Sequence, residues 1–127
     1  MAQHPLEPLN AEEVRQTAAI LRREGHVTDS FRFTSIELKE PPKGEVKAWC
    51  PGDPVPRKSF AVVLDRAENK TYEATVDLTG DAVVSFTHIA GVMPNFTVDE
   101  FHDVDAAMRT HPEVIAALAV RGFTDMS

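Results

Sequence analysis

The first apolar pattern in the chain has helical spacing, with apolar side chains at Val14, Ala18 and Leu21. Positions three or four residues apart share one helix face, so the pattern predicts an amphipathic helix. Asn10 is a helix-capping residue type, and Glu13 follows at the spacing of a reciprocal capping box. We expect Gly25 to end this helix, because glycine adopts the left-handed conformation without strain.

The next segment, FRFTSIELKE, alternates with the two-residue period of a strand, but the period slips once. Phe31 and Phe33 share one face, whereas Ile36 and Leu38 fall on the other parity. A slip of one residue indicates a β-bulge near residues 34–35. The alternative is a regular strand whose two faces are both partly covered.

The segment PPKGEVKAWCPGDPVPRK holds five of the nine prolines in the chain. Because proline has no backbone N–H donor, this segment is predicted to be a surface connection rather than a central strand. Trp49 is its expected anchor.

Three more strands are predicted at short spacing, in SFAVVLD, TYEATVDLT and AVVSFTHIA. The first places Ala61 and Val63 on the face opposite to Phe60, Val62 and Leu64. The second alternates with its inward side chains at Tyr72, Ala74, Val76 and Leu78. One helix followed by four antiparallel strands predicts an α+β class with the helix packed on a four-stranded sheet. This order of elements resembles a cystatin-like fold.

Two helix starts follow in the last third of the chain. Thr97 and Glu100 form a predicted capping box, and Phe96 can pack on Phe101 as a hydrophobic staple. Thr110 and Glu113 have the spacing of a second box, and Gly122 is expected to close that helix. No strands follow these helices, so we expect them to need a partner surface outside residues 1–127.

The charge balance narrows the classes of partner. Twenty acidic residues against thirteen basic ones give a net charge of −7. An acidic chain disfavours non-specific binding to nucleic acid or to anionic membranes, so neither partner is expected. The N-terminal segment shows no signal-peptide pattern, and the single cysteine cannot form an internal disulfide, which favours a reducing compartment such as the cytoplasm.

The residues that could carry chemistry do not form a recognisable site. His4, His26, His88, His102 and His111 show neither the i, i+4 spacing of a helical metal pair nor a His-x-His pair. Cys50 lacks a nucleophile motif, and the acidic residues at 99–105 fit the first turns of a helix, where negative charge is favoured. We therefore assign no catalytic, cofactor-binding or metal-binding residue.

Several segments together resemble the N-terminal region of bacterial copper-containing primary-amine oxidases. They are HPLEPLNAEEV, RFTSIELKEPPK, AVVLDRAENKTYEATVDL, VVSFTHIAGVMPNFTVDEF and HPEVIAALAVRGFTDMS, in this order. The resemblance implies two small cystatin-like domains that precede a catalytic domain. Residues 1–95 would be the first small domain, and residues 96–127 would be the helical opening of the second, which the chain leaves incomplete.

The resemblance also implies the parent chemistry, which is oxidative deamination of primary amines to aldehyde, ammonia and hydrogen peroxide by Cu(II) and topaquinone. The parent is expected to be a homodimer in which this segment contacts the remainder of the oxidase chain. The quinone is made from a tyrosine in an Asn-Tyr-Asp/Glu motif, but Tyr72 follows Thr71 and occupies a core position. We expect a non-catalytic structural domain, and the alternative is a free-standing cystatin-like binding or protein-interaction module without enzymatic activity.

Overall fold

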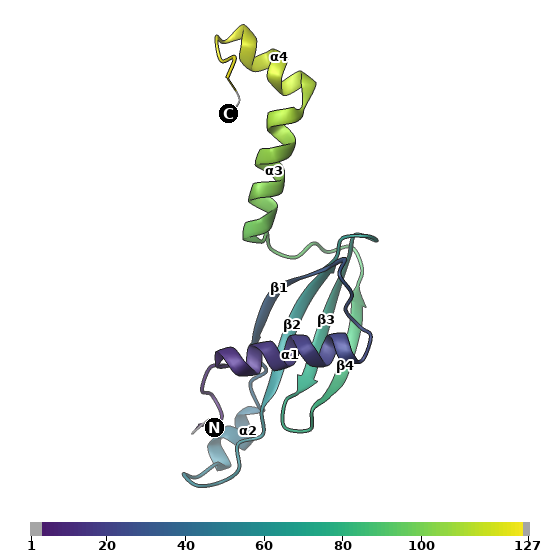
Figure 1. The fold of residues 1–127 in the computed structure, drawn as a ribbon. Coiled ribbons are helices and arrows are strands. Elements are labelled where there is room, and N and C mark those ends of the chain that lie inside the picture. Colours follow the sequence, from purple (N-terminus) through teal and green to yellow (C-terminus); the bar gives the residue numbers. More distant parts are fainter. Residues whose placement is uncertain (1–3, 126–127) are drawn as a thin grey trace. The chain divides into compact units, whose positions relative to one another are not determined.

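The chain folds as two compact units, Met1–Pro94 and Asn95–Ser127, in a computed structural model that describes residues 4–125. The first unit contains α1 (Ala11–Arg23), β1 (Phe31–Leu38), α2 (Lys43–Ala48), β2 (Lys58–Asp65), β3 (Lys70–Asp77) and β4 (Ala82–Ile89). The second contains α3 (Val98–Thr110) and α4 (Pro112–Val120). Figure 1 shows these elements along the chain.

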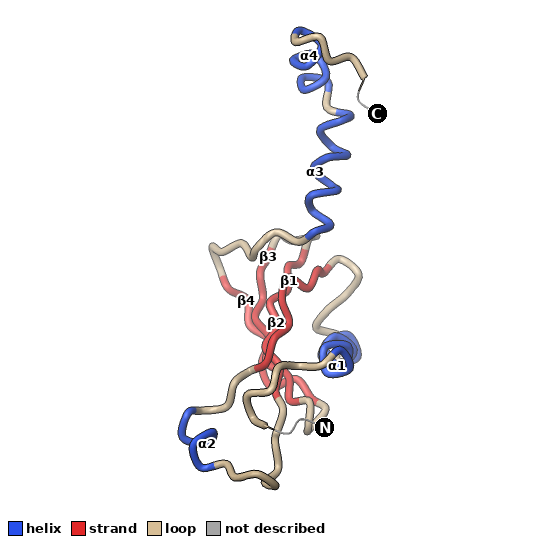
Figure 2. Tube along the Cα trace, turned by 90° about the vertical axis from the view of Figure 1, so that its left-hand side faces the viewer, coloured by secondary structure: helices blue, strands red, loops and turns tan. Residues whose placement is uncertain are grey.

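The first unit is a two-layer α+β structure, and the predicted fold class is confirmed. The four strands form an antiparallel sheet in the order β1-β2-β3-β4, so each strand pairs with its neighbour in the sequence. Helix α1 crosses one face of this sheet (Figures 1 and 2). The short hairpin turns between β2, β3 and β4 have left-handed residues at Asn69 and Asp81, types that tolerate this conformation.

The hydrophobic core lies between α1 and the inner face of the sheet. The helix buries Thr17, Ile20 and Leu21. The sheet contributes buried side chains at Ala61, Val63, Ala74, Val76 and Leu78. The inward alternation predicted for β3 is therefore confirmed, and Tyr72 packs at the margin of the core.

The predicted bulge in β1 is also confirmed. The pairing of β1 with β2 shifts register between Phe33 and Ser35, and Thr34 donates a side-chain hydrogen bond to the Val62 carbonyl at 3.1 Å. The shift returns Ile36 to the same face as Phe33, so both pack against the core.

The predicted ends of α1 are correct. Asn10 Oδ1 accepts from the backbone N–H groups of Glu12 and Glu13, and the Glu13 carboxylate accepts from the Asn10 N–H at 2.9 Å. Gly25 has a φ of +77° just after the helix. At the same end, Arg23 donates to the Asp81 carboxylate and to its carbonyl, both at 2.6 Å, which ties α1 to the β3–β4 turn.

The proline-rich connection between β1 and β2 contains no strand, as predicted. It contains the short helix α2, which has no buried residue and begins directly after Pro42, where the missing N–H of proline is no loss.

One local prediction was wrong. Thr110 does not cap α4: it is the last residue of α3, and its hydroxyl donates to the carbonyls of Ala106 and Ala107. His111 occupies the cap position without a side-chain hydrogen bond, and Pro112 starts the helix.

Replacing Leu21, which is fully buried in the α1–sheet core, tests this packing. We expect Leu21→Ala to lower the free energy of unfolding by about 2–5 kcal/mol, because the cavity it leaves is only partly filled by relaxation. Val84→Ala is the matched control, since Val84 is 57% exposed, and it should change stability by less than about 0.5 kcal/mol. Urea unfolding monitored by circular dichroism measures both variants. Equal unfolding midpoints for the two would contradict the assigned core.

Candidate functional site

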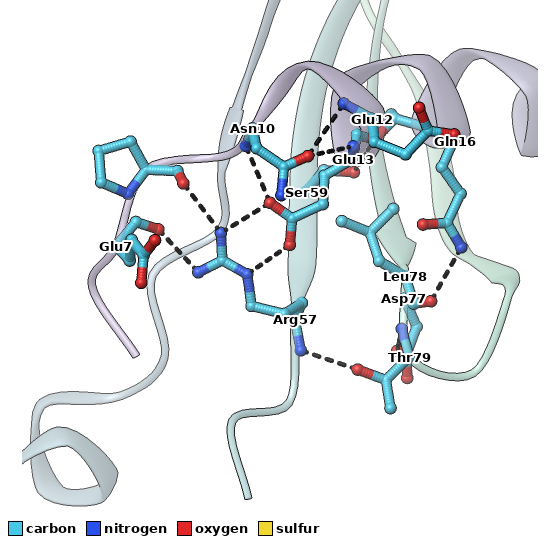
Figure 3. A network of polar contacts seen from close by, with 12 residues as sticks. Glu7, Asn10, Glu12, Glu13, Gln16, Arg57, Ser59, Asp77, Leu78 and Thr79 are labelled. Carbon is cyan, nitrogen blue, oxygen red and sulfur yellow. Dashed lines mark hydrogen bonds and ion pairs between the residues drawn. The ribbon is translucent and has the colours of Figure 1, made fainter. Parts of the chain in front are cut away.

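The most highly connected polar side chain of the first unit is Arg57, which lies just before β2 and is only 6% exposed. Its guanidinium makes four hydrogen bonds (Figure 3). Nε and Nη2 donate to the two carboxylate oxygens of Glu13 at 2.7 and 3.1 Å. Nη1 donates to the Glu7 carbonyl at 2.7 Å, and Nη2 to the Pro8 carbonyl at 3.1 Å.

Glu13 therefore serves two partners at once. One carboxylate oxygen closes the capping box on Asn10, and both oxygens receive the guanidinium fork. The Glu13 pKa is held below its ordinary value of 4.5, chiefly by the hydrogen bond from Arg57 and, against the opposing effect of burial, also by the Asn10 N–H. This bidentate, charge-assisted geometry is the strong form of an ion pair.

The backbone around Arg57 extends the same network to the far end of β3. The Arg57 N–H donates to the Thr79 hydroxyl at 2.9 Å, and its carbonyl accepts from the Leu78 N–H at 2.9 Å. Gln16 of α1 donates to the Leu78 carbonyl at 3.0 Å. The network thus joins the N-terminal segment, the start of α1 and two strands. Its role is structural, because each donor and acceptor named here already has a hydrogen-bond partner within the network.

A groove of about 740 Å³ lies beside α2, and Trp49 is among the residues that line it. Its other lining residues are Pro5, Lys39, Glu40, Pro41, Pro42, Glu45, Ala48, Asp53, Pro54, Pro56, Lys58 and Thr75. The indole N–H of Trp49 donates to the Asp53 carbonyl at 3.3 Å, and the His4 ring meets the indole edge-on at 5.0 Å. Trp49 thus contacts its own connection and the N-terminal segment, and the groove combines apolar walls with charges of both signs.

The histidines are distributed over the fold. His26 stacks on Phe86 at 4.9 Å, and His88 lies 5.3 Å from the Tyr72 ring, whereas His102 and His111 belong to the second unit. Within residues 4–125, no group of three His, Cys, Asp or Glu side chains could hold a metal ion. Cys50 is exposed at the end of α2.

Tyr72 does not have the surroundings of a reactive group. Its ring is stacked on Phe86 at a centroid distance of 4.8 Å and lies 5.8 Å from Phe31. It is thus part of an aromatic layer at the margin of the core. Neither Tyr72 nor the described histidines fit a tyrosine-derived quinone or a copper site, and we derive no chemical step through either group.

Most of the exposed large apolar side chains in the described part of the chain belong to the second unit. None of its described residues is buried. On α3 the apolar side chains at Val98, Phe101, Val104 and Met108 are 73%, 68%, 53% and 49% exposed. The predicted capping box of Thr97 and Glu100 is present, and the Phe96 and Phe101 rings lie 6.2 Å apart as the predicted staple. Neighbouring exposed apolar side chains of this kind are typical of surfaces that contact a partner.

The start of α3 repeats the start of α1 at an interval of 87 residues. Both helices have 13 residues and a capping box, formed by Asn10 and Glu13 in α1 and by Thr97 and Glu100 in α3. The same interval relates four residues of α1 to four of α3. Val14 and the buried Thr17, Ile20 and Leu21 correspond in this order to Phe101, Val104, Ala107 and Met108. The correspondence ends with α3, because α4 has no counterpart after α1.

This correspondence and Arg57 were the functional features that the sequence analysis missed. The correspondence had a signal, since two capping boxes precede the same apolar spacing in the sequence. Arg57 also had a signal in the sequence, because it lies on the same strand parity as Ser59, Ala61 and Val63, which face the core.

A search of the helices within residues 4–125 for a membrane span finds none with sufficient length and hydrophobicity.

Comparison with known proteins agrees with the resemblance read from the sequence. A family model described as the AGAO-like N2 domain matches residues 10–86, which covers α1 and most of the four-stranded sheet. The chain is 44% identical over 124 residues to a primary amine oxidase of Arthrobacter sp. (strain P1), covering 97% of this chain and 19% of that protein. It is 34% identical over 125 residues to a primary amine oxidase of Klebsiella aerogenes, covering 96% of this chain and 16% of that protein.

A solved structure is similar in fold. The copper-containing benzylamine oxidase from Hansenula polymorpha superposes with a TM-score of 0.80 at 18% sequence identity, over 91% of this chain and 19% of that one. The predicted resemblance to the N-terminal region of copper amine oxidases is confirmed. The chain spans about a fifth of the length of the curated relatives named here.

Neutralising Glu13 tests the Arg57 network. We expect Glu13→Gln to lower the free energy of unfolding by about 1.5–3 kcal/mol at pH 7, because glutamine keeps the cap but removes the charge from a hydrogen-bonded pair. Glu12→Gln is the matched control, since the Glu12 side chain is 84% exposed.

The same pair predicts a pH dependence. Because the folded-state pKa of Glu13 is depressed, its contribution is present above its ordinary pKa of 4.5 and is lost as the pH falls through the folded value. The stability difference between the wild-type chain and Glu13→Gln should therefore shrink below pH 4.5 in urea titrations. A difference that stays constant down to the acid transition would contradict the depressed pKa.

Proposed function

The chain belongs to the AGAO-like N2 domain family, and from this premise we propose that it is a non-catalytic structural domain of a copper- and topaquinone-dependent primary-amine oxidase. The single observation that carries the proposal is the 44% identity to a primary amine oxidase over 97% of the chain. In the parent, a primary amine would be oxidised to an aldehyde with release of ammonia and hydrogen peroxide. Copper and the quinone would supply that chemistry from residues outside this chain.

The role of the first unit in the parent is to provide a rigid scaffold. Its core is closed by α1 and locked by the buried Arg57–Glu13 pair. A domain of this kind positions its surfaces with little freedom, which suits packing against other parts of a large enzyme. We also propose that the parent is a cytoplasmic homodimer, as the resemblance to the bacterial oxidases implies.

The second unit is the opening of another small domain of the same kind. Support comes from the 87-residue correspondence: α3 carries the cap and the apolar face with which α1 covers a sheet, while the described residues of its own unit contain no strand. The polypeptide that follows Ser127 would provide that sheet. Hydrophobic burial would then stabilise α3 as it stabilises α1.

The length and cofactor content of the native gene product test the proposed function. We expect a polypeptide about five times as long as this chain, because the chain spans 19% of its Arthrobacter relative. Intact mass spectrometry, copper analysis and quinone staining of the purified product measure this directly. A native product that ends at Ser127 and lacks both cofactors would contradict the proposal and favour a free-standing interaction module.

Amide hydrogen exchange tests whether a sheet from the following polypeptide packs on α3. In the 127-residue chain the α3 amides should exchange within about a factor of ten of an unstructured peptide, because isolated helices of this length are marginal in water. In the full-length product the same amides should be strongly protected, whereas the α1 amides should be protected in both. Equal exchange of α3 in the two proteins would contradict the second small domain.

A further inference from the structure

Glu13 and Glu100 are the carboxylates of the two capping boxes, and they differ in the partners they have outside their own helix. Glu13 caps α1 and also receives Arg57, whose Nε and Nη2 lie 2.7 and 3.1 Å from its two oxygens. Arg57 lies 44 positions after Glu13, directly before β2 of the sheet that α1 covers. The guanidinium also reaches the Pro8 carbonyl, two residues before the cap. In this fold the capping carboxylate is thus the point at which the sheet holds the start of its helix.

Glu100 closes its capping box but has no cationic partner among the described residues. The Thr97 N–H and hydroxyl both donate to the same carboxylate oxygen of Glu100, at 2.6 and 3.2 Å. The other oxygen takes part in no hydrogen bond or ion pair within residues 4–125. It corresponds to the oxygen of Glu13 that accepts from Arg57 Nε, and Asn95 stands two residues before Thr97 as Pro8 does before Asn10.

Resting on the proposed function, we propose that Glu100 is a docking carboxylate for an arginine carried by the sheet that follows Ser127. The apolar face of Phe101, Val104 and Met108 would meet the sheet, and the ion pair would fix the register of the helix on it. A guanidinium fits this position better than an ammonium, because only its planar fork can span both carboxylate oxygens and still reach a backbone carbonyl. The negative first turn of α3, with Asp99 and Glu100, complements that charge.

Glu100→Gln in the full-length gene product tests this inference. Glutamine keeps the capping function and removes the charge. Asp99→Asn is the matched control, because it removes one charge from the same helical turn and leaves Glu100 in place. We expect the α3 amides of Glu100→Gln to exchange at least about 10-fold faster than those of Asp99→Asn, the loss associated with a hydrogen bond to a charged group. In the 127-residue chain, which lacks the sheet, the two variants should exchange alike.

The outcomes separate this inference from the proposed function. If α3 is protected in the full-length product and both variants exchange alike there, the second domain stands and the docking role of Glu100 is wrong. If α3 is unprotected in the full-length product, both the second domain and the docking role are wrong. If Glu100→Gln already exchanges 10-fold faster than Asp99→Asn in the 127-residue chain, the effect arises from the cap alone and the docking role is again wrong.

Discussion

The fold of the first unit depends on one buried charge. Arg57 is almost fully enclosed, and a guanidinium in such a place is tolerated only where its donors and its charge are both satisfied. Glu13 can meet that demand only if α1 is capped at Asn10 and crosses the sheet with its first turn near the start of β2. The carbonyls of Glu7 and Pro8 meet the rest, which holds the N-terminal segment in place. Hydrophobic burial supplies most of the stabilising free energy, but it is non-directional, and the ion pair specifies where the helix sits.

Patterns that depend on neighbours in the chain could be predicted from the sequence. The alternation of Tyr72, Ala74 and Val76, the capping boxes at Asn10 and Thr97, and the slip in β1 each arise within a few residues, and the structure has all of them. Thr110 shows where this reasoning fails. A threonine in the last turn of one helix can bond back to the preceding turn as readily as it caps the next, and here it bonds back to Ala106 and Ala107. The spacing of Thr110 and Glu113 is the same in both cases, so spacing could not decide.

Contacts between distant segments could not be read from the chain in the same way. Nothing near Arg57 in the sequence distinguishes it from Lys58, although one is buried and the other exposed. The two residues differ only in strand parity. Parity predicts which of them is buried only when it is known which face of the strand is directed toward the core. The Trp49 groove likewise forms from segments that meet only in the folded unit. Recognising the family from whole segments succeeded because those segments preserve side-chain patterns that no single rule of spacing captures.

Helices α1 and α3 have the same kind of cap and the same apolar spacing, but they differ in how far their apolar faces are buried. Helix α1 has a cap, an apolar face, a sheet and a cation, and its inward residues Ile20 and Leu21 are buried. Helix α3 has the cap, the Phe96–Phe101 staple and the apolar face, yet Phe101 is 68% exposed. Local devices of this kind contribute about 1 kcal/mol each, which favours the helical conformation but is small beside the gain from burying several large apolar side chains, about 1.5–3 kcal/mol each. If the second unit is the opening of another small domain, as we propose, its sheet would give α3 the kind of surface that Arg57 and β2 provide for α1.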